Sequence, residues 1–271
     1  MVNMARLILE KEYGLDPSKL YTIPHGVPEV HRTAPDKVKK SLHFEGQTLL
    51  STFGLLSSGK GIEYVVRALP EVVKRHPDLL YLVIGQTHPE VRRREGERYR
   101  NSLYELIKKL NIEKHVRFVN QYLSQHDLIR YLLATDLYIT PYIGRYQITS
   151  GTLAYALGCG KAVISTPYLY ASEALAEGRG VLSEFQNPKS MARCISMLLE
   201  EPALRAHCER GAFEYGQAMS WRNVGARYAD LFRTVTGSAE YPSSILAIRN
   251  LASHVEERIG LVGRPVAALS S

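Results

Sequence analysis

The sequence predicts an α/β fold, a doubly wound parallel sheet with helices on both faces. Apolar segments of four to six residues alternate with longer amphipathic segments, an order typical of strands joined by crossover helices. The segment 79–84 is apolar throughout, as expected for a strand covered on both sides. Two loops rich in glycine or hydroxyl residues, 54–61 and 149–152, each stand between a predicted strand and a predicted helix.

The predicted strands, in chain order, are 20–23, 49–53, 79–84, 116–119, 137–140, 162–165 and 180–182. The predicted helices are 4–13, 35–42, 62–76, a long polar helix ending near 110, 125–134, 150–157, 172–176, 190–200, 202–219, 221–235 and 245–259. The strands are short apolar runs, and the helices carry apolar residues three or four positions apart.

Composition indicates a globular protein of one large or two ordinary domains, with 271 residues, 45% hydrophobic and 23% charged. No apolar run approaches the roughly 20 residues of a membrane helix. The first residues are amphipathic, include acidic side chains and lack a small-residue cleavage site, so we expect no signal peptide and a cytoplasmic location.

The net charge of +7 favours anionic partners without choosing among nucleotide, nucleic acid and lipid headgroup. The densest basic run, residues 92–100, is interleaved with glutamates that would repel phosphates. We therefore interpret it as a solvated helix face and expect no nucleic-acid partner, while peripheral membrane contact stays open.

The three cysteines Cys159, Cys194 and Cys208 are scattered, so we expect buried apolar residues and neither disulfides nor a zinc site. No histidine or carboxylate cluster has metal-ligand spacing, and no nucleophile motif is present. We predict no metal and no cofactor.

The loop 54–61 is glycine-rich and places Lys60 at a helix start. It is not a Walker sequence, because Gly61 stands where a hydroxyl residue is required. A cation at a helix N-terminus opposes the helix dipole, so Lys60 is explained best by an anionic ligand. A solvent-facing lysine is the alternative.

The loop Thr149-Ser150-Gly151-Thr152 enters the predicted helix 150–157. Free backbone amides and hydroxyls at a helix start suit a phosphate, although an ordinary Ser/Thr cap explains the loop equally well. The carboxyl ends of parallel strands share one edge of a sheet, where ligands bind. Side chains that follow these ends are Lys60, His88, Asn120, Arg145 and Gln147.

For several other polar residues the structural interpretation competes with the functional one. We expect His25 in a hydrogen-bonded turn and His126 on a helix surface, while His88 could contact a ligand. Tyr168 and Tyr170 follow another strand end, where acceptor contact and core packing are both open.

Taken in order, the motifs at 24–28, 53–61, 116–119, 134–141 and 159–164 resemble the nucleotide-sugar-binding half of family 4 (group 1) retaining glycosyltransferases. The resemblance covers about residues 15–235. It implies the C-terminal Rossmann-like domain of a GT-B fold, with a first helix (1–14) left from a missing N-terminal acceptor domain. Residues 236–271 would form a linker, a helix and a frayed tail.

The resemblance assigns the donor diphosphate to Gly54, Lys60 and Gly61, with Leu55 at a position where the family has arginine. The amides of Thr149, Ser150 and Gly151 match further diphosphate contacts, and Thr152 is a further predicted substrate-binding residue. We add Asn120 and Gln121 to the predicted substrate-binding residues.

The family's Glu-x7-Glu motif aligns with Gln147 and Tyr155, so both glutamates are replaced. Gln147 can hold sugar hydroxyls but offers no negative charge to an oxocarbenium-like transition state. Tyr155 takes the position near the ribose. We interpret Lys60 and Gln147 as the catalytic candidates.

We therefore predict a donor-binding half that transfers a hexose from a UDP- or GDP-sugar to an acceptor hydroxyl with retention. A non-catalytic nucleotide-sugar-binding module or truncated fragment is the first alternative. A sugar-modifying enzyme of the same architecture is the second.

Overall fold

The computed structural model describes residues 3–237. Within them, the residues up to Tyr228 form one compact unit, and those from Ala229 on belong to a second unit. The predicted helix 245–259 and the predicted tail lie outside the described residues.

The first unit is built on a six-stranded sheet in the order β3-β2-β1-β4-β5-β6, and every neighbouring pair is parallel. The strands are β1 (Thr48–Phe53), β2 (Leu79–Ile84), β3 (Val116–Val119), β4 (Leu137–Thr140), β5 (Ala162–Ser165) and β6 (Val181–Leu182). Strands β2 and β3 lie on one side of β1, and β4, β5 and β6 lie on its other side. The strand order therefore reverses between β1 and β4, which are neighbours at the centre. The predicted fold class is confirmed.

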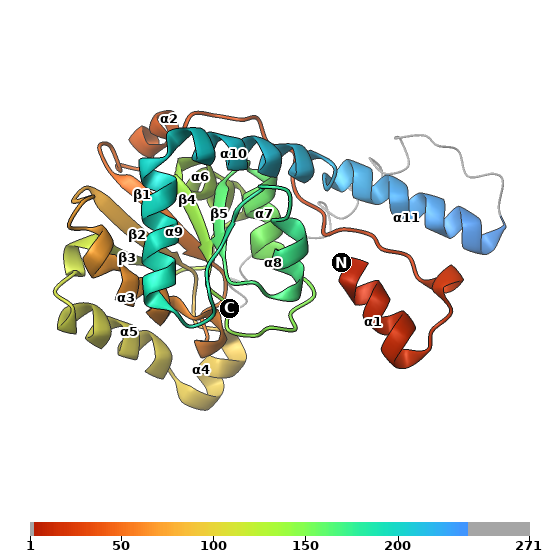
Figure 1. Ribbon diagram of the computed structural model, residues 1–271, viewed down its shortest axis with the longest axis horizontal. Helices are drawn as coiled ribbons and strands as arrows, with labels where there is room; N and C mark the ends of the chain where they lie inside the picture. The colour runs from red at the N-terminus through yellow and green to blue at the C-terminus, as the bar shows by residue number, and fades with distance from the viewer. Residues whose placement is uncertain (1–2, 238–271) are drawn as a thin grey trace, which may run out of the picture. The chain divides into compact units, whose positions relative to one another are not determined.

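Helices join the strands and enclose the sheet (Figure 1). The helices from the N-terminal side to the middle of the chain are α1 (Asn3–Tyr13), α2 (Pro35–Ser41), α3 (Ile62–Val72), α4 (Pro89–Glu95), α5 (Arg98–Lys109) and α6 (Gln125–Ala134). Those that follow are α7 (Gly151–Gly158), α8 (Leu169–Ala174), α9 (Pro188–Glu200), α10 (Pro202–Gln217) and α11 (Trp221–Thr236). Short 3-10 helices occur at Pro17–Lys19, Ser58–Lys60 and Glu113–His115.

The core lies on both faces of the sheet, because neighbouring strand residues point to opposite sides. Leu50 belongs to a cluster with residues of α3, α5 and α9. Its neighbour Leu49 belongs to a second cluster, which includes Phe44 and Ala134 of α6. Tyr138 of β4 packs with residues of α7 and α8. Burial on both faces explains the uninterrupted apolar runs of the strands.

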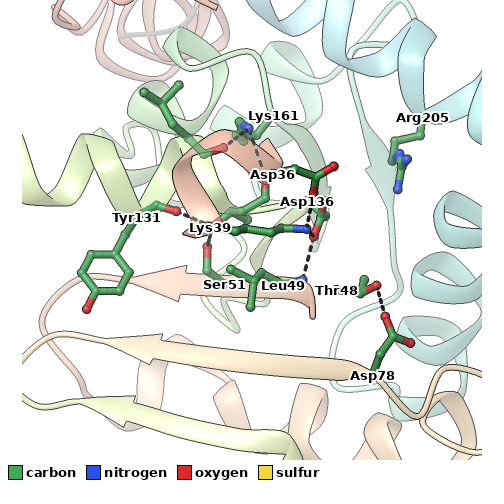
Figure 2. Close-up of polar contacts among 12 residues, drawn as sticks. Asp36, Lys39, Thr48, Leu49, Ser51, Asp78, Tyr131, Asp136, Lys161 and Arg205 are labelled. Atoms are coloured by element: carbon green, nitrogen blue, oxygen red, sulfur yellow. Dashed lines mark hydrogen bonds and ion pairs between the residues drawn. The ribbon is translucent and has the colours of Figure 1, made fainter. Parts of the chain in front are cut away.

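A buried polar cluster ties the amino ends of the central strands together (Figure 2). The Asp136 carboxylate accepts a hydrogen bond from the Leu49 amide at 2.7 Å and pairs with the Lys39 ammonium at 2.7 Å. The buried Lys161 ammonium donates to the carbonyl oxygens of Leu133 and Thr135, at 3.1 and 3.0 Å. These carbonyls end α6, where the helix dipole favours a cation. Burial nevertheless lowers the pKa of Lys161.

Some predicted elements differ in the structure. The predicted strand 20–23 is wrong: this segment stays outside the sheet, and the chain pairs further on, where Val27 exchanges backbone hydrogen bonds with Met219 and Trp221. The long polar helix is interrupted at Gly96, which ends α4 before α5 begins. The helix predicted over 62–76 ends at Val72, and α8 starts earlier than predicted, at Leu169.

In the part of the chain that the structure describes, no helix has both the length and the apolar character needed to cross a membrane.

Candidate functional site

The site lies where the loops after β1 and β4 meet, at the carboxyl ends of the two central strands. Such a reversal point between neighbouring strands is where ligands bind in open parallel sheets. The Ile143 amide donates to the Gly59 carbonyl at 3.2 Å, which joins the two loops. Gly61 has a φ of +64°, and a Cβ there would lie 2.1 Å from the Pro141 carbonyl oxygen. Only glycine fits this contact.

Lys60 extends from the β1 loop toward the start of α7. Its ammonium donates to the Tyr142 hydroxyl at 2.9 Å and lies 4.1 Å from the centroid of the Tyr142 ring. It also borders Gly54, where an added Cβ would lie 3.5 Å from Nζ and 3.2 Å from the Thr152 methyl. The structure therefore brings three of the predicted site residues together: Gly54, Lys60 and Thr152.

The α7 helix begins with a capping hydroxyl and an open first turn. Ser150 Oγ accepts from the Leu153 amide at 3.2 Å, and the Ser150 carbonyl accepts from the Ala154 amide at 3.0 Å. The first amides of a helix have no intrahelical acceptor, so those of Gly151 and Thr152 stand at the open end. The cap interpretation is confirmed, because Ser150 caps the helix. Anion binding stays a prediction, and the remaining amides suit it.

The β1 loop is held by the loop after β2. The Leu56 amide donates to the Gln86 carbonyl at 2.8 Å, and the His88 amide donates to the Leu56 carbonyl at 2.9 Å. Buried Arg100 donates to the Gly85 carbonyl at 2.9 Å, which fixes the second loop from behind. The backbone that carries Lys60 is thus supported along one side.

His25 lies against the first turn of α7. Its Nδ1 is 2.7 Å from the Gly26 carbonyl oxygen, so Nδ1 carries the hydrogen and donates it. A Cβ on Gly151 would lie 2.9 Å from His25 Nε2. The turn contact expected for His25 is present, and the ring also faces the helix start.

Tyr155 belongs to an aromatic group on the outer side of α7. Its ring centroid lies 6.2 Å from that of His25 and 6.4 Å from that of Phe53. Burial raises the pKa of Tyr155, and a hydrogen bond with the Trp221 side chain acts in the opposite direction. Tyr155 is therefore a neutral phenol where the family motif has a carboxylate.

Gln147 lies in the β4 loop, two residues from Thr149. Its side-chain amide donates to the Thr149 carbonyl at 2.9 Å. The backbone carbonyl of Gln147 accepts from the Tyr170 backbone amide at 3.0 Å. These contacts shape the loop that leads into α7. Like Tyr155, Gln147 adds no charge to the site.

Other predicted residues lie at the same edge but not in this cluster. Asn120 and Gln121 are exposed after β3, the outermost strand on that side of the sheet. His88 is the N-cap of α4, where Nδ1 accepts from the Glu90 amide at 3.2 Å. The Arg145 guanidinium lies 4.6 Å from the centroid of the Phe185 ring.

Tyr142 is the residue that sequence reasoning missed. It follows the end of β4 by two positions, and that place at a carboxyl strand end was the available signal. Tyr168 stacks on it, with ring centroids 5.3 Å apart and planes 20° apart. Tyr168 and Tyr170 are both buried, as the core-packing interpretation expects. His126 is exposed on α6, also as expected.

Among residues 3–237, no group of three or more histidine, cysteine or carboxylate side chains is arranged to hold a metal ion. The site instead combines one ammonium, several hydroxyls and the open end of a helix. This chemistry suits an anionic ligand such as a phosphate.

A model of the family described as glycosyl transferases group 1 matches residues 34–215, more than half of the chain. Among curated proteins, the chain is similar to the phosphatidyl-myo-inositol mannosyltransferase of Mycolicibacterium smegmatis, with 26% identity over 218 residues, which cover 80% of this chain and 52% of the relative. It is also similar to the GDP-mannose-dependent monoacylated alpha-(1-6)-phosphatidylinositol monomannoside mannosyltransferase of Corynebacterium glutamicum, with 25% identity over 225 residues, covering 78% of this chain and 55% of the relative. The chain spans about half the length of the curated relatives it matches.

Solved structures show the same fold. A glycosyltransferase from Rickettsia africae superposes with a TM-score of 0.74 at 19% identity, over 88% of this chain and 62% of that one. Anabaena HepE in complex with UDP-glucose superposes with a TM-score of 0.70 at 18% identity, over 82% of this chain and 60% of that one. The expected likeness to GT-B glycosyltransferases is confirmed at the level of fold. Because the matched residues run from α2 into α10 and include both loops of the site, this chain belongs to the group 1 glycosyltransferases.

Proposed function

We propose that this chain is the donor-binding half of a glycosyltransferase that moves a hexose from a nucleotide-diphosphate sugar to an acceptor hydroxyl with retention. One observation carries the proposal: the Lys60 ammonium stands beside Gly54 and Thr152, at the open start of α7. A cation then lies beside the first turn of a helix, an arrangement that suits a leaving diphosphate.

The named relatives support a sugar-nucleotide donor. One is described as GDP-mannose-dependent, and HepE was solved with UDP-glucose. The nucleotide of this chain is therefore UDP or GDP in our proposal. We place the reaction in the cytoplasm on the sequence arguments given above, with peripheral membrane contact left open.

The diphosphate gains negative charge as the bond to the sugar breaks. Lys60 and the amides of Gly151 and Thr152 would stabilise that charge in a site that needs no metal and no cofactor. The hydroxyls of Thr149 and Ser150 would offset the missing family arginine, whose position is taken by Leu55.

Gln147 would hold hydroxyls of the donor sugar. An amide side chain provides both a donor and an acceptor, but no negative charge for an oxocarbenium-like transition state. Tyr155 would accept one hydrogen bond from the ribose. We therefore expect donor affinity to be retained better than rate. Asn120 and Gln121 remain predicted substrate contacts.

An N-terminal acceptor-binding domain would complete the enzyme. The chain covers 52% of the first relative's length, which leaves room in that relative for such a domain. The proposal requires this chain to bind the donor, but it does not require this chain to transfer the sugar without an acceptor-binding domain.

A second candidate is a nucleotide-sugar-binding module without catalysis. The observation that favours it is that neither Gln147 nor Tyr155 can supply a carboxylate, and burial keeps Tyr155 protonated by raising its pKa. The phosphate side of the site would still bind.

Release of UDP and GDP from UDP- and GDP-hexoses separates the two candidates, measured with this chain alone and with the polypeptide encoded directly upstream. Transfer that appears with the upstream polypeptide, with an unchanged anomeric configuration by NMR, supports the enzyme. Nucleotide binding without release in either mixture supports the module. Absence of nucleotide binding contradicts both.

A further inference from the structure

We propose that Tyr142 is a positioning residue, whose hydroxyl aims the Lys60 ammonium at the diphosphate. This inference rests on the proposed donor-binding function and adds a residue to it. The relevant contacts are those among Lys60, Tyr142 and the first turn of α7.

The hydrogen bond from Lys60 to Tyr142 has one direction. An ammonium has three N–H donors and no acceptor, so the phenol oxygen must accept. The N···O distance is 2.9 Å, and the ammonium also lies over the ring, 4.1 Å from its centroid. One donor of Lys60 is used, and the others remain for a ligand.

The same hydroxyl connects Lys60 with α7. Tyr142 Oη lies 2.6 Å from Thr152 Oγ1, and Thr152 Oγ1 lies 3.1 Å from Ser150 Oγ. Because Tyr142 accepts from Lys60, its own proton is available to Thr152. The ammonium and the helix start are thereby held in one hydrogen-bonded chain.

Tyr142 is itself immobilised. It is 2% exposed, its ring stacks on Tyr168, and its carbonyl accepts from the Thr166 hydroxyl. A lysine side chain is flexible and loses much rotational freedom when it is fixed. A rigid acceptor at its tip lowers that loss at the moment when the ligand binds.

The alternative is that the Tyr142 hydroxyl only satisfies a buried polar atom. Tyr81 of β2 provides the matched control, because it is a buried tyrosine whose hydroxyl donates to the buried Thr52 Oγ1 at 2.7 Å. Changing either residue to phenylalanine deletes one buried hydroxyl and keeps the ring. Only Tyr142→Phe removes a contact with Lys60.

The test measures UDP and GDP affinity by isothermal titration calorimetry for wild type, Tyr142→Phe, Tyr81→Phe, Lys60→Ala and Lys60→Ala/Tyr142→Phe. Uridine and guanosine, which lack the diphosphate, are titrated in parallel. We expect Tyr142→Phe to weaken diphosphate binding about three- to tenfold, the usual worth of one hydrogen bond. The affinity for the nucleosides and the affinity of Tyr81→Phe for the diphosphates should be unchanged.

The double variant decides between positioning and packing. If Tyr142 acts through Lys60, Tyr142→Phe has no further effect once Lys60 is alanine. The inference is overturned if Tyr142→Phe causes equal losses of affinity in the wild-type and Lys60→Ala backgrounds, or if it leaves the affinity unchanged. In either case, diphosphate binding by the wild type leaves the proposed function standing. Absence of diphosphate binding by the folded wild-type chain overturns both.

Thr152→Val provides a second variant should Tyr142→Phe fold poorly. It keeps the shape of the side chain and removes the hydrogen bond between the Tyr142 hydroxyl and residue 152. We expect a smaller loss of diphosphate affinity, which again disappears in the Lys60→Ala background. A loss that persists there contradicts the proposed coupling.

Discussion

The carbonyl oxygen of Gly54 lies 2.2 Å from the position that a Cβ on Gly85 would occupy. The two glycines end β1 and β2, and this contact brings the loop that carries Lys60 against its neighbour. The spacing leaves no room for a methyl group. The arrangement of the site therefore depends on a residue that touches no ligand in our proposal.

We expect Gly85→Ala to lower the free energy of unfolding by about 2–3 kcal/mol, because the new Cβ clashes and the φ of +132° is unfavourable for alanine. Urea denaturation measures the change. Gly225→Ala is the control, since α11 leaves open space around that position, and alanine there should stabilise by about 0.5–1 kcal/mol. Equal stability of Gly85→Ala and wild type would refute the contact.

Asp136 should be the most sensitive residue of the polar cluster in Figure 2. Asp136→Ala leaves the Lys39 ammonium, whose side chain is 8% exposed, without its close partner, and we expect a loss of about 3–5 kcal/mol. Asp36→Ala removes the same lysine's other partner, which is 93% exposed, and should cost less than about 1 kcal/mol. Similar effects of the two substitutions would contradict the burial argument.

The Thr48 hydroxyl donates to the Asp78 carboxylate at 2.6 Å and lowers the pKa of Asp78 (Figure 2). A lowered carboxyl pKa contributes stability above the unfolded value of 3.8, which is lost as pH falls through the folded value. Thr48→Val should therefore be less stable than wild type at pH 7, by no more than about 0.5 kcal/mol, because solvent screens the exposed Asp78 carboxylate. The difference should vanish in acid. A difference that is constant with pH would show that the hydrogen bond does not act through Asp78.

The thiols should be unreactive in the folded protein. Cys159, Cys194 and Cys208 are buried, and burial raises the pKa of each, that of Cys159 to about 12. The thiolate is the nucleophile, so Ellman's reagent should react slowly under native conditions and with all three thiols in guanidinium. Rapid labelling of a native thiol would be inconsistent with this packing.

The central strands could be predicted because both of their faces are buried, which leaves an uninterrupted apolar run such as 79–84. The segment 20–23 has a short apolar run too, but it does not pair with the sheet. The backbone further on, at Val27, pairs with the link between α10 and α11. Apolar character alone does not reveal which edge a segment can reach.

For the site, the sequence indicated Lys60 and the helix start, because a cation at a glycine-rich loop and hydroxyls before a helix are local signals. Tyr142 carries only its position after a carboxyl strand end, which does not reveal what its side chain contacts. Its contact with Lys60 joins positions 82 residues apart and exists only because β1 and β4 are neighbours. The side-chain roles predicted for Asn120 and Gln121 stay predictions.

The proposed contact between Lys60 and the diphosphate is tested by the affinity of UDP and GDP for wild type and Lys60→Ala. Calorimetry measures both affinities, with Lys114→Ala as control. Lys114 is exposed just before β3, at the amino end of that strand, whereas the site lies at the carboxyl ends of the strands. We predict that Lys60→Ala weakens binding of the nucleotide by roughly 1–3 kcal/mol while Lys114→Ala leaves it unchanged. Equal affinities of wild type and Lys60→Ala would contradict the claim that Lys60 contacts the diphosphate.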